Sequence, residues 1–426
     1  MRIEIAHLSD SHLGYEAYPE TRSSEGFNQR GKDVVRAMTD CVNAIVSADP
    51  DLVVHSGDVL DRPAVSRKYE VHAKRLLEKL AGVRPDGTRR QVVVIAGNHE
   101  LPRSRKEACW LGLLSGIPGL HVVSNTYDRI RFNGADVPES LADVVVHTLP
   151  HDLLKTVDFD GVVPVEGAVN VLTAHGVAGG SDLWKRTVNR EHAIPTDVLA
   201  RDWDYVALGH WHKRGPVDIG GFTTTNTPIW YAGSAERMGF GDLRPGSDER
   251  GWLRVVLAPG TESPLRVFPQ DISVRPMFKL DPVDLSDVDV TKMTDALVEV
   301  VKAHDLVGAI AHLQVTGISR DVYGLVDMGP VRQAAADSLH FKVTLLVPDT
   351  PEAVDQAEAD VAMAGGIAEA LEAELAKLDE AMAEGVRALA QQLLGSALGD
   401  VEGDAKPTSS EAQVSKGRVD PQKDAA

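Results

Sequence analysis

Cysteine is nearly absent from this 426-residue sequence, and long apolar runs are missing altogether. The two cysteines, Cys41 and Cys109, lie far apart, which argues against a disulfide framework and suits a reducing compartment such as the cytoplasm. No segment approaches the ~20 consecutive apolar residues that cross a bilayer, so we expect no membrane-spanning helix. Charged Arg2 and Glu4 stand at the very start, which argues against a signal peptide. We therefore expect a cytoplasmic protein without a membrane partner.

Positive charge is also scarce, because 63 acidic residues outnumber 44 basic ones and leave a net charge of −19. The excess is uneven. Residues 281–426 hold 11 basic and 27 acidic side chains, so residues 1–280 hold the other 33 and 36. An acidic surface argues against a polyanionic partner. Since the first 280 residues are close to neutral before any bound metal is counted, the net charge does not exclude a nucleic-acid substrate.

Length and composition predict several domains. A 426-residue chain with 43% hydrophobic and 25% charged residues is an ordinary globular protein, too long for one small core. The composition shifts near residue 276, near residue 351 and again after Gly399, where little remains that could be buried. We expect a main domain over residues 1–275, a small α+β unit over 276–350, a helical element over 351–398 and a disordered tail over 399–426.

Short apolar segments alternate with amphipathic ones in the main domain. The pattern predicts helices over 32–48 and 66–81 and strands over 3–8, 51–55, 92–96, 144–149, 169–174, 205–208 and 229–232. In the small unit it predicts a helix over 290–303 and strands over 310–315 and 341–347. Alternating strands and helices indicate an α/β layered core, whose functional residues lie in loops after the carboxyl ends of the strands.

Five pieces of sequence place candidate metal ligands at such strand ends. They are Asp10-Ser-His12, Gly57-Asp58, Gly97-Asn98-His99-Glu100, His175 and Gly209-His210-Trp211-His212. Residues i and i+2 of an extended chain point to the same side, so each Asp-x-His or His-x-His piece can offer two ligands together. Each piece alone is more often a structural hydrogen bonder. All five in this order predict a site of oxygen and imidazole ligands.

Such a ligand set suits a pair of divalent cations with one carboxylate bridging both. Asp58, on its glycine turn, is well suited to the bridging position. Asn98 offers a neutral oxygen, which limits the negative charge that an incoming phosphate would meet. Two metal ions about 3.5–4 Å apart can activate a water and stabilise the attacking and leaving oxygens of a phosphodiester. The sequence therefore predicts a two-metal phosphoesterase.

The five pieces resemble the calcineurin-like metallophosphoesterases and, among them, the SbcD-type nuclease subunits of double-strand-break repair complexes. The narrower resemblance rests on residues 7–15, 57–61, 97–100, 205–214 and 229–242. The last of these segments holds no candidate ligand, so a generic phosphatase would have no reason to match it. The resemblance covers residues 1–270 and continues without distinctive motifs to about residue 350. It implies a β-sandwich flanked by helices, with the small unit as a capping, DNA-binding domain.

The resemblance also implies the role of each candidate residue. One manganese ion would be held by Asp10, His12, Asp58 and His212, and the other by Asp58, Asn98, His175 and His210. His99 would contact the scissile phosphate and help the leaving oxygen depart. The ligand types accord with manganese but do not exclude magnesium, iron or zinc. Asp61 stands where some members carry a second catalytic histidine. It could partner a ligand histidine or reduce exonuclease action, and we leave it unassigned.

The resemblance further implies a DNA nuclease, with 3′-to-5′ exonuclease and single-strand or hairpin endonuclease activity, that acts as a homodimer with an SMC-like coiled-coil ATPase. The apolar stripe of residues 351–398 would bind that ATPase, or would pack on the chain's own capping domain. One alternative is a phosphomonoesterase or cyclic-nucleotide phosphodiesterase on the same fold, against which the 229–242 segment and the C-terminal domains argue. The other is a non-catalytic scaffold, against which the complete ligand set and His99 argue.

Basic side chains near the predicted ligands are candidates for contacts with DNA phosphates or for ordinary solvated surface. They are Arg103, Arg105, Lys106, Lys213 and Arg214. Trp184, with Lys185, Arg186 and Arg190, is either a substrate-contacting loop or a packed aromatic with charged neighbours. We interpret the other histidines as structural. His151 is the least certain of them, because it begins a loop directly after a strand.

Overall fold

The computed structural model describes residues 2–22, 28–101, 108–181, 193–219, 229–243 and 249–347. The chain divides into two compact units, Met1–Val347 and Pro348–Ala426, and the described residues all belong to the first. The predicted helical element and tail over 351–426 lie outside the described residues. Across the part of the chain that is described, no helix has the length and apolar character needed to span a membrane.

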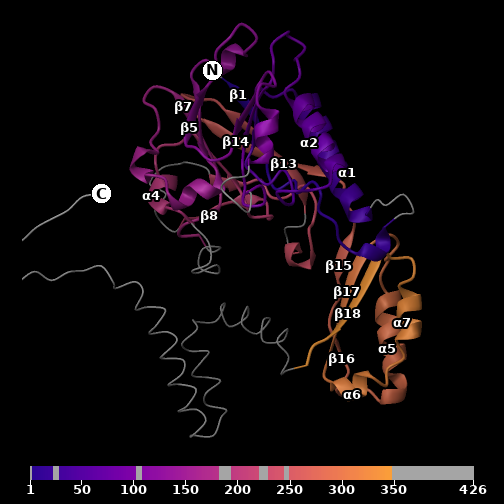
Figure 1. The fold of residues 1–426 in the computed structure, drawn as a ribbon. Helices are drawn as coiled ribbons and strands as arrows, with labels where there is room; N and C mark the ends of the chain where they lie inside the picture. The colour runs from indigo at the N-terminus through magenta and orange to yellow at the C-terminus, as the bar shows by residue number, and fades with distance from the viewer. Residues whose placement is uncertain are drawn as a thin grey trace, which may run out of the picture. The chain divides into compact units, whose positions relative to one another are not determined.

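Two six-stranded sheets build the main part of the first unit, and several of their strands are labelled in Figure 1. The first has the order β14 (Leu265–Ile272), β13 (Arg250–Leu257), β1 (Ile3–Leu8), β2 (Leu52–His55), β3 (Gln91–Ile95) and β4 (Leu120–Val123). The second has the order β11 (Gly215–Pro216), β12 (Ile229–Tyr231), β10 (Tyr205–Gly209), β7 (Val169–His175), β6 (Val144–Leu149) and β5 (Asp128–Arg131). Strands β1 to β4 run parallel, as do β6, β7, β10 and β12.

Apolar side chains from both sheets pack against one another and make the molecule a β-sandwich. Alternate residues of each strand point into this layer, including Ile3, Ile5 and Val93 from the first sheet and Val146 and Val171 from the second. Helices α1 (Gln29–Ala48) and α2 (Arg67–Leu80) cover the other face of the first sheet. Because these parallel strands are buried on both faces, they appear in the sequence as continuous apolar runs rather than alternating ones.

The predicted fold class is confirmed, and the predicted elements agree closely with the observed ones. Strands 3–8 and 144–149 have the predicted bounds. Helix α1 begins three residues before its predicted start, because the Asn28 side chain accepts a hydrogen bond from Gly31 N and caps the helix. Strands β4, β5, β13 and β14 were not predicted. The sequence pattern does not predict the long hairpin β13–β14, because the edge strand β14 is half exposed and contains Pro269.

Shorter elements connect the strands. They are α4 (Thr196–Leu199), the strand pair β8 (Val177–Ala178) and β9 (Ala193–Ile194), and the 3-10 turns η1 (Pro19–Thr21), η2 (Trp110–Leu114), η3 (Glu139–Leu141), η4 (His151–Lys155), η5 (Phe159–Gly161) and η6 (Phe240–Asp242). The outer face of the second sheet is closed by α4 and by Trp203, together with residues of the 149–162 loop. Both sheets therefore have a covered outer face, and the strand ends remain as the place for a site.

A small α+β unit follows the sandwich. Its central strand β17 (Ile310–Thr316) pairs in parallel with β15 (Met277–Lys279), β16 (Val283–Asp284) and β18 (His340–Leu345). Helices α5 (Val290–Lys302), α6 (Arg320–Tyr323) and α7 (Met328–Ala334) accompany this sheet and share its apolar core. Phe240 of η6 packs against His312 of β17, with ring centroids 5.0 Å apart. The small unit thus touches the sandwich through a turn that also leads to the candidate site.

Buried charges tie helix α1 to the segment before the small unit. Arg30 is fully buried, donates to the Asp33 carboxylate at 2.9 Å and to the carbonyl of Arg237, and lies 3.6 Å from the Glu236 carboxylate. Arg275 contacts the same Asp33 with two nitrogens, at 2.5 and 2.8 Å. Charges removed from water are costly unless each is paired, so this network holds its three segments in one arrangement.

Replacing Arg30 by alanine should therefore lower the free energy of unfolding by about 3–5 kcal/mol, because Asp33 and Glu236 would stay buried with less compensation. Urea denaturation followed by circular dichroism measures the change. The matched control is Arg2→Ala, which removes an exposed pair with Glu4 and should cost no more than about 1 kcal/mol. Similar losses for the two variants would show that the network contributes little.

Candidate two-metal site

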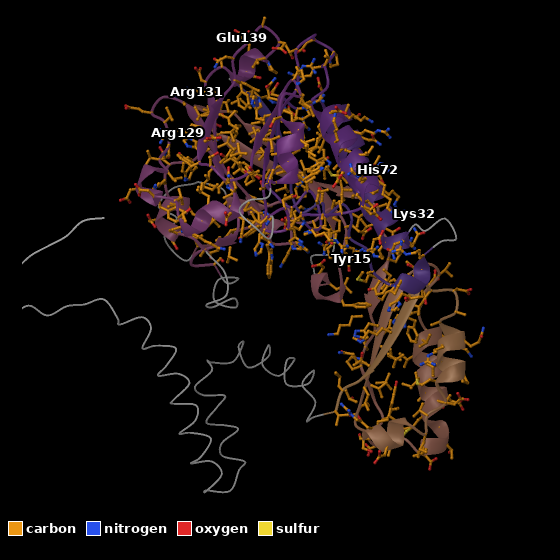
Figure 2. The ribbon with its side chains drawn as sticks, viewed as in Figure 1. Tyr15, Lys32, His72, Arg129, Arg131 and Glu139 are labelled. Carbon is orange, nitrogen blue, oxygen red and sulfur yellow. The ribbon has the colours of Figure 1, made fainter. Side chains whose placement is uncertain are left out.

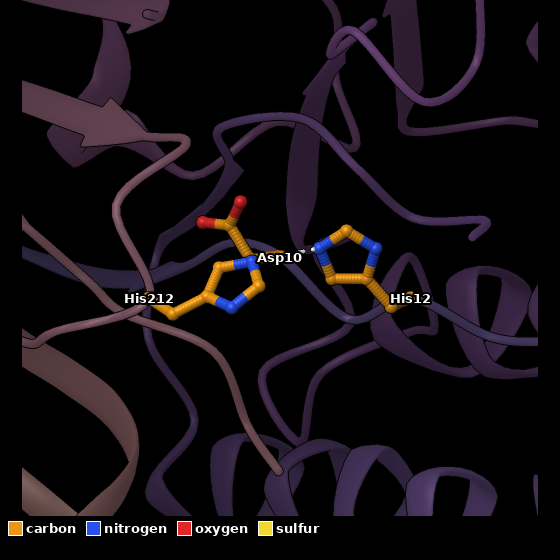
Figure 3. Close-up of side chains that lie close together, drawn as sticks. All are labelled: Asp10, His12 and His212. Atoms are coloured by element: carbon orange, nitrogen blue, oxygen red, sulfur yellow. Dashed lines mark hydrogen bonds between the residues drawn. The ribbon is translucent and has the colours of Figure 1, made fainter. Parts of the chain in front are cut away.

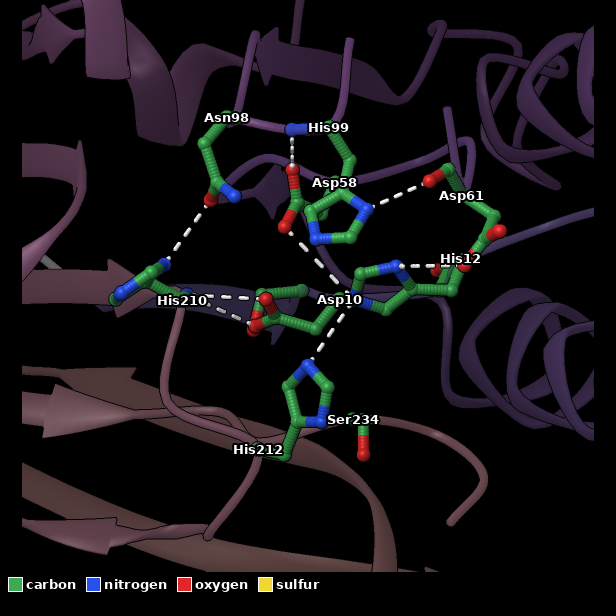
Figure 4. Close-up of polar contacts among 12 residues, drawn as sticks. Asp10, His12, Asp58, Asp61, Asn98, His99, His210, His212 and Ser234 are labelled. Carbon is green, nitrogen blue, oxygen red and sulfur yellow. Dashed lines mark hydrogen bonds and ion pairs between the residues drawn. The ribbon is translucent and has the colours of Figure 1, made fainter. Parts of the chain in front are cut away.

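The predicted ligands come together where strands of both sheets end (Figure 4). Asp10 and His12 follow β1, Asp58 follows β2, and Asn98 follows β3 in the first sheet. From the second sheet come His175, the last residue of β7, and His210 and His212, which follow β10. Parallel strands deliver their carboxyl ends to one edge, and the sandwich places the two edges side by side. All seven predicted ligands, together with His99, meet there.

The loops that carry the ligands are fixed by their backbones. Asp10 N donates to Gly57 O and His12 N donates to Asp58 O, both at 3.0 Å, which joins the loops after β1 and β2. Asp10, His12, Asp58 and His210 have φ values of 50°, 44°, 55° and 99°, in the left-handed region that non-glycine residues seldom adopt. Such strain persists only where the surroundings enforce it, and it is typical of functional sites.

The first cluster of ligand atoms contains Asp10, His12 and His212, whose candidate ligand atoms all lie within 4.8 Å of one another (Figure 3). The Nε2 atoms of His12 and His212 are only 3.0 Å apart. The Asp10 carboxylate accepts from His210 N at 3.0 and 3.1 Å through its two oxygens. Two imidazole nitrogens and a carboxylate therefore point at one small volume.

The second cluster surrounds His175. Its Nε2 lies 2.9 Å from Asn98 Oδ1 and 3.2 Å from Asp58 Oδ2. Asn98 Oδ1 also lies 3.0 Å from His210 Nδ1. Asp58 Oδ2 is in turn 3.7 Å from His12 Nε2, in the first cluster. The Asp58 carboxylate thus stands between the two clusters, as a bridging ligand must.

The hydrogen-bonding pattern around His175 is compatible with a bound cation. Its Nδ1 lies 2.7 Å from the Ser56 carbonyl oxygen, which can only accept, so Nδ1 carries the hydrogen and Nε2 presents a lone pair. That lone pair faces the oxygens of Asp58 and Asn98, which are acceptors too. Acceptors brought this close need either a proton or a positive ion between them. Oxygen and imidazole ligands of this kind suit a hard or borderline divalent metal.

Charge coupling at the site supports the same conclusion. Burial alone would lower the pKa of His175, but the adjacent Asp58 carboxylate outweighs it and raises the pKa to about 9. Burial would raise the pKa of Asp58, yet the charge and hydrogen bond of His175 hold it below its usual range. The metal-free site therefore retains a proton beside Asp58, in a position where a cation would supply the same positive charge.

His99 lies beside the clusters with its backbone fixed. Its N–H donates to Asp58 Oδ1 at 2.9 Å, and its Nδ1 lies 2.6 Å from the Asp61 carbonyl oxygen, so the ring keeps Nε2 without the hydrogen when neutral. The ring lies edge to face with His12, with centroids 4.6 Å apart. The Asp61 carboxylate lies 3.6 Å from His12 Nδ1. The unassigned Asp61 thus contacts both a predicted ligand and the predicted catalytic residue.

Three further residues belong to the site but received no predicted role. The buried Glu100 carboxylate accepts from the backbone N–H groups of Gly97, Asp58 and Leu60 at 2.8–3.0 Å. Burial, followed by the charge of Asp58, raises its pKa to about 7. Asp242 approaches His212 Nδ1 at 3.2 Å. There, burial would raise the carboxyl pKa, but the His212 contact lowers it to about 2.

His151 is the third. Our interpretation of it as structural stays a prediction, but its ring lies beside two predicted ligands. Its Nδ1 lies 3.2 Å from the His175 carbonyl oxygen, and its ring centroid is 5.9 Å from those of His175 and His210. It follows strand β6 directly, so the position after a strand end was the signal that could have found it. Asp242 lacks that signal, because it acts through a folded turn, whereas Glu100 lies in the Gly97–Glu100 piece after β3 without a predicted role.

The predicted basic contacts are only partly described. Lys213 is exposed and lines an open recess with His210, His212 and Asp242. Arg214 instead contacts two residues of strand β14. It pairs with the Asp271 carboxylate and donates to Gln270 O at 3.2 Å. Arg103, Arg105 and Lys106, and Trp184 with Lys185, Arg186 and Arg190, lie outside the described residues.

Known proteins are similar to the part of the chain that carries this site. Residues 3–214 match the family model described as calcineurin-like phosphoesterase. The DNA double-strand break repair protein Mre11 of Methanococcus maripaludis is 24% identical, and the match covers 57% of this chain and 59% of that protein. Mre11 of Methanocaldococcus jannaschii is 32% identical, with 49% of this chain and 51% of that protein covered. The SbcD subunit of the SbcCD nuclease of Bacillus subtilis is 27% identical, with 61% of this chain and 70% of that protein covered. The chain thus spans only 59% and 51% of the length of the two Mre11 proteins.

The close approach of Gly97 to Asp58 gives a test of the bridging position. A Cβ at residue 97 would lie 2.1 Å from Asp58 Oδ1, so Gly97→Ala must displace the carboxylate. We expect Mn²⁺ affinity, measured by calorimetric titration, to fall by about 10–100-fold or more. Gly112→Ala is the control, because its Cβ would meet no atom within 4 Å. Unchanged affinity in Gly97→Ala would contradict a ligand role for Asp58.

The proton held at His175 predicts how metal binding depends on pH. With its pKa raised to about 9, metal-free His175 is protonated at pH 7, and a cation must displace that proton. Mn²⁺ affinity should therefore rise between pH 6 and pH 8, by about tenfold per pH unit for each proton displaced. Titrations in buffers of different ionisation enthalpy count the released protons. A pH-independent affinity would exclude His175 as a ligand.

Proposed function

We propose that the chain hydrolyses DNA phosphodiester bonds as the nuclease subunit of a double-strand-break repair complex, because residues 3–214 match the family model described as calcineurin-like phosphoesterase. The observation that carries the proposal is the convergence of two clusters of acceptor atoms around a shared carboxylate, Asp58. Relatives named Mre11 and SbcD support the choice of DNA repair over other phosphoesterase reactions.

In this proposal Asp10, His12, Asp58 and His212 hold one divalent cation, and Asp58, Asn98, His175 and His210 hold the other. We propose manganese as the metal. When bound, two such ions polarise water and the phosphodiester oxygens. The neutral amide of Asn98 keeps one ligand position free of negative charge, so the site repels the incoming phosphate less than a further carboxylate would.

His99 is the residue proposed to act on the substrate. Its Nδ1–H points to the Asp61 carbonyl, so the opposite nitrogen, Nε2, is the one available to a phosphate oxygen or leaving group. A histidine beside the scissile bond can bind the phosphate or pass a proton to the leaving oxygen. The backbone contact of His99 N with Asp58 Oδ1 fixes its distance from the ligands.

The remaining features of the proposal concern assembly. We propose 3′-to-5′ exonuclease and single-strand or hairpin endonuclease activity by a cytoplasmic homodimer that works with an SMC-like ATPase. Residues 1–275 would form the nuclease domain and 276–350 the capping domain. Residues 351–398 would bind the ATPase, ahead of a disordered tail over 399–426.

The first test compares wild type with His99→Leu on labelled single-stranded and blunt duplex DNA, with and without Mn²⁺. Cleavage should require the metal and fall by about 10²–10⁴-fold in the variant, while Mn²⁺ affinity stays unchanged because His99 is not a proposed ligand. His72→Leu is the control, since His72 is an exposed residue of α2 that is not among the proposed site residues (Figure 2).

Each outcome decides between functions. If wild type alone cuts no DNA, the assay is repeated with the ATPase partner, and continued inactivity would contradict the nuclease proposal. Rapid hydrolysis of a nucleoside monophosphate or cyclic nucleotide, with DNA left intact, would establish the phosphatase or cyclic-nucleotide phosphodiesterase alternative. Equal cleavage by His99→Leu would remove His99 from the reaction.

A further inference from the structure

We infer that Asp242 is a positioning residue that fixes the tautomer of His212, so that Nε2 of His212 is the nitrogen that faces the metal site. The inference rests on the proposed two-metal function and adds to it a residue outside the proposed ligand set. It concerns how one ligand is kept competent to bind, and it can be tested without measuring catalysis.

The geometry of the His212 ring carries the argument. Its Nδ1 lies 3.2 and 3.4 Å from the two oxygens of the Asp242 carboxylate. An ionised carboxylate accepts hydrogen bonds but cannot donate one. Nδ1 must therefore carry the ring hydrogen. Nε2 is then left with its lone pair, and it lies 3.0 Å from His12 Nε2 inside the first cluster. Only this tautomer of His212 can give a metal an imidazole lone pair at that point.

Asp242 is itself held in place by the residues around it. Its Oδ2 accepts from Met238 N at 2.6 Å, and its carbonyl oxygen accepts from Arg250 at 2.9 Å. Arg250 is buried and also donates to the His212 carbonyl oxygen at 2.7 Å. One guanidinium thus fixes the backbones of Asp242 and His212 relative to each other. A carboxylate held this firmly dictates the ring orientation rather than following it.

His175 and His212 differ in how their rings are oriented. His175 donates to a backbone carbonyl, Ser56 O, which no side-chain substitution removes. His212 depends on a side chain in a short turn, η6. Changing that one side chain can therefore alter the tautomer of a single ligand and leave the others as they are. Partners of this kind typically change metal affinity by about 10–100-fold when they are replaced.

The decisive variant is Asp242→Asn, which keeps the shape but removes the obligatory acceptor. The asparagine oxygen can still accept from Met238 N, so its NH₂ group turns to His212 Nδ1 and donates to it. The ring hydrogen then moves to Nε2, which loses its lone pair for the metal. Asp242→Ala leaves Nδ1 to water, which accepts as well as donates. We therefore expect Asn to weaken Mn²⁺ binding by about 10–100-fold and Ala to weaken it less.

Calorimetric titration gives affinity and stoichiometry, and electron paramagnetic resonance of bound Mn²⁺ distinguishes a coupled pair from an isolated ion. Asp242→Asn should lose the coupled signal while the melting temperature of its metal-free form stays close to that of wild type. A merely structural role predicts the opposite order, with Ala more damaging than Asn. Asp271→Asn is the control, because it changes an exposed carboxylate of strand β14, which pairs with Arg214.

The outcomes separate this inference from the proposed function. If wild type binds two coupled ions and Asp242→Asn binds them equally well, the inference is overturned and the two-metal site stands. If wild type binds no pair of ions, both the inference about Asp242 and the proposed two-metal site are overturned. Should Asp242→Asn fail to fold, Asp242→Glu decides, because it restores an acceptor. It must then bind Mn²⁺ more tightly than Asp242→Ala, and equal affinities would overturn the inference.

Discussion

The site depends on one buried negative charge, the carboxylate of Asp58. A buried anion is costly unless it is paired and hydrogen-bonded. Here His175 and His12 approach one of its oxygens, and the backbone N–H of His99 donates to the other. Glu100 then holds the backbone on both sides of Asp58 through Asp58 N and Leu60 N. The loops after three strands are therefore arranged around a single charge, and a pair of cations is its natural complement.

The proposed ligands could be selected from the sequence because each follows an apolar strand within a few residues, and parallel strands bring such ends together. His175 and His210 needed no knowledge of the fold beyond that order. The roles of Asp242 and Glu100 could not be found in this way. Their roles depend on how a turn or loop folds back onto residues that are 30 and about 40 positions away, as their contacts with His212 and Asp58 show. Resemblance marked their segments but gave no reason for the individual residues.

The small α+β unit and the site share a structural element. Turn η6 carries Asp242, which contacts His212, and Phe240, which packs on His312 of strand β17. Arg275, in the segment that leads to the small unit, binds Asp33 of helix α1. The boundary between the two parts is thus made of fixed contacts rather than of a free linker. This explains why residues up to Val347 form one compact unit although they build separate sheets.

The position of β1 has a consequence for how the protein is made. This first strand lies in the middle of its sheet, between β2 and β13, and Ile3 pairs with Leu257. At a synthesis rate of about 5–20 residues per second, the edge of β1 waits roughly 10–50 s for its second partner to leave the ribosome. An apolar strand with an open edge is prone to join another chain. That edge of the nascent protein therefore stays open to such pairing until β13 has left the ribosome.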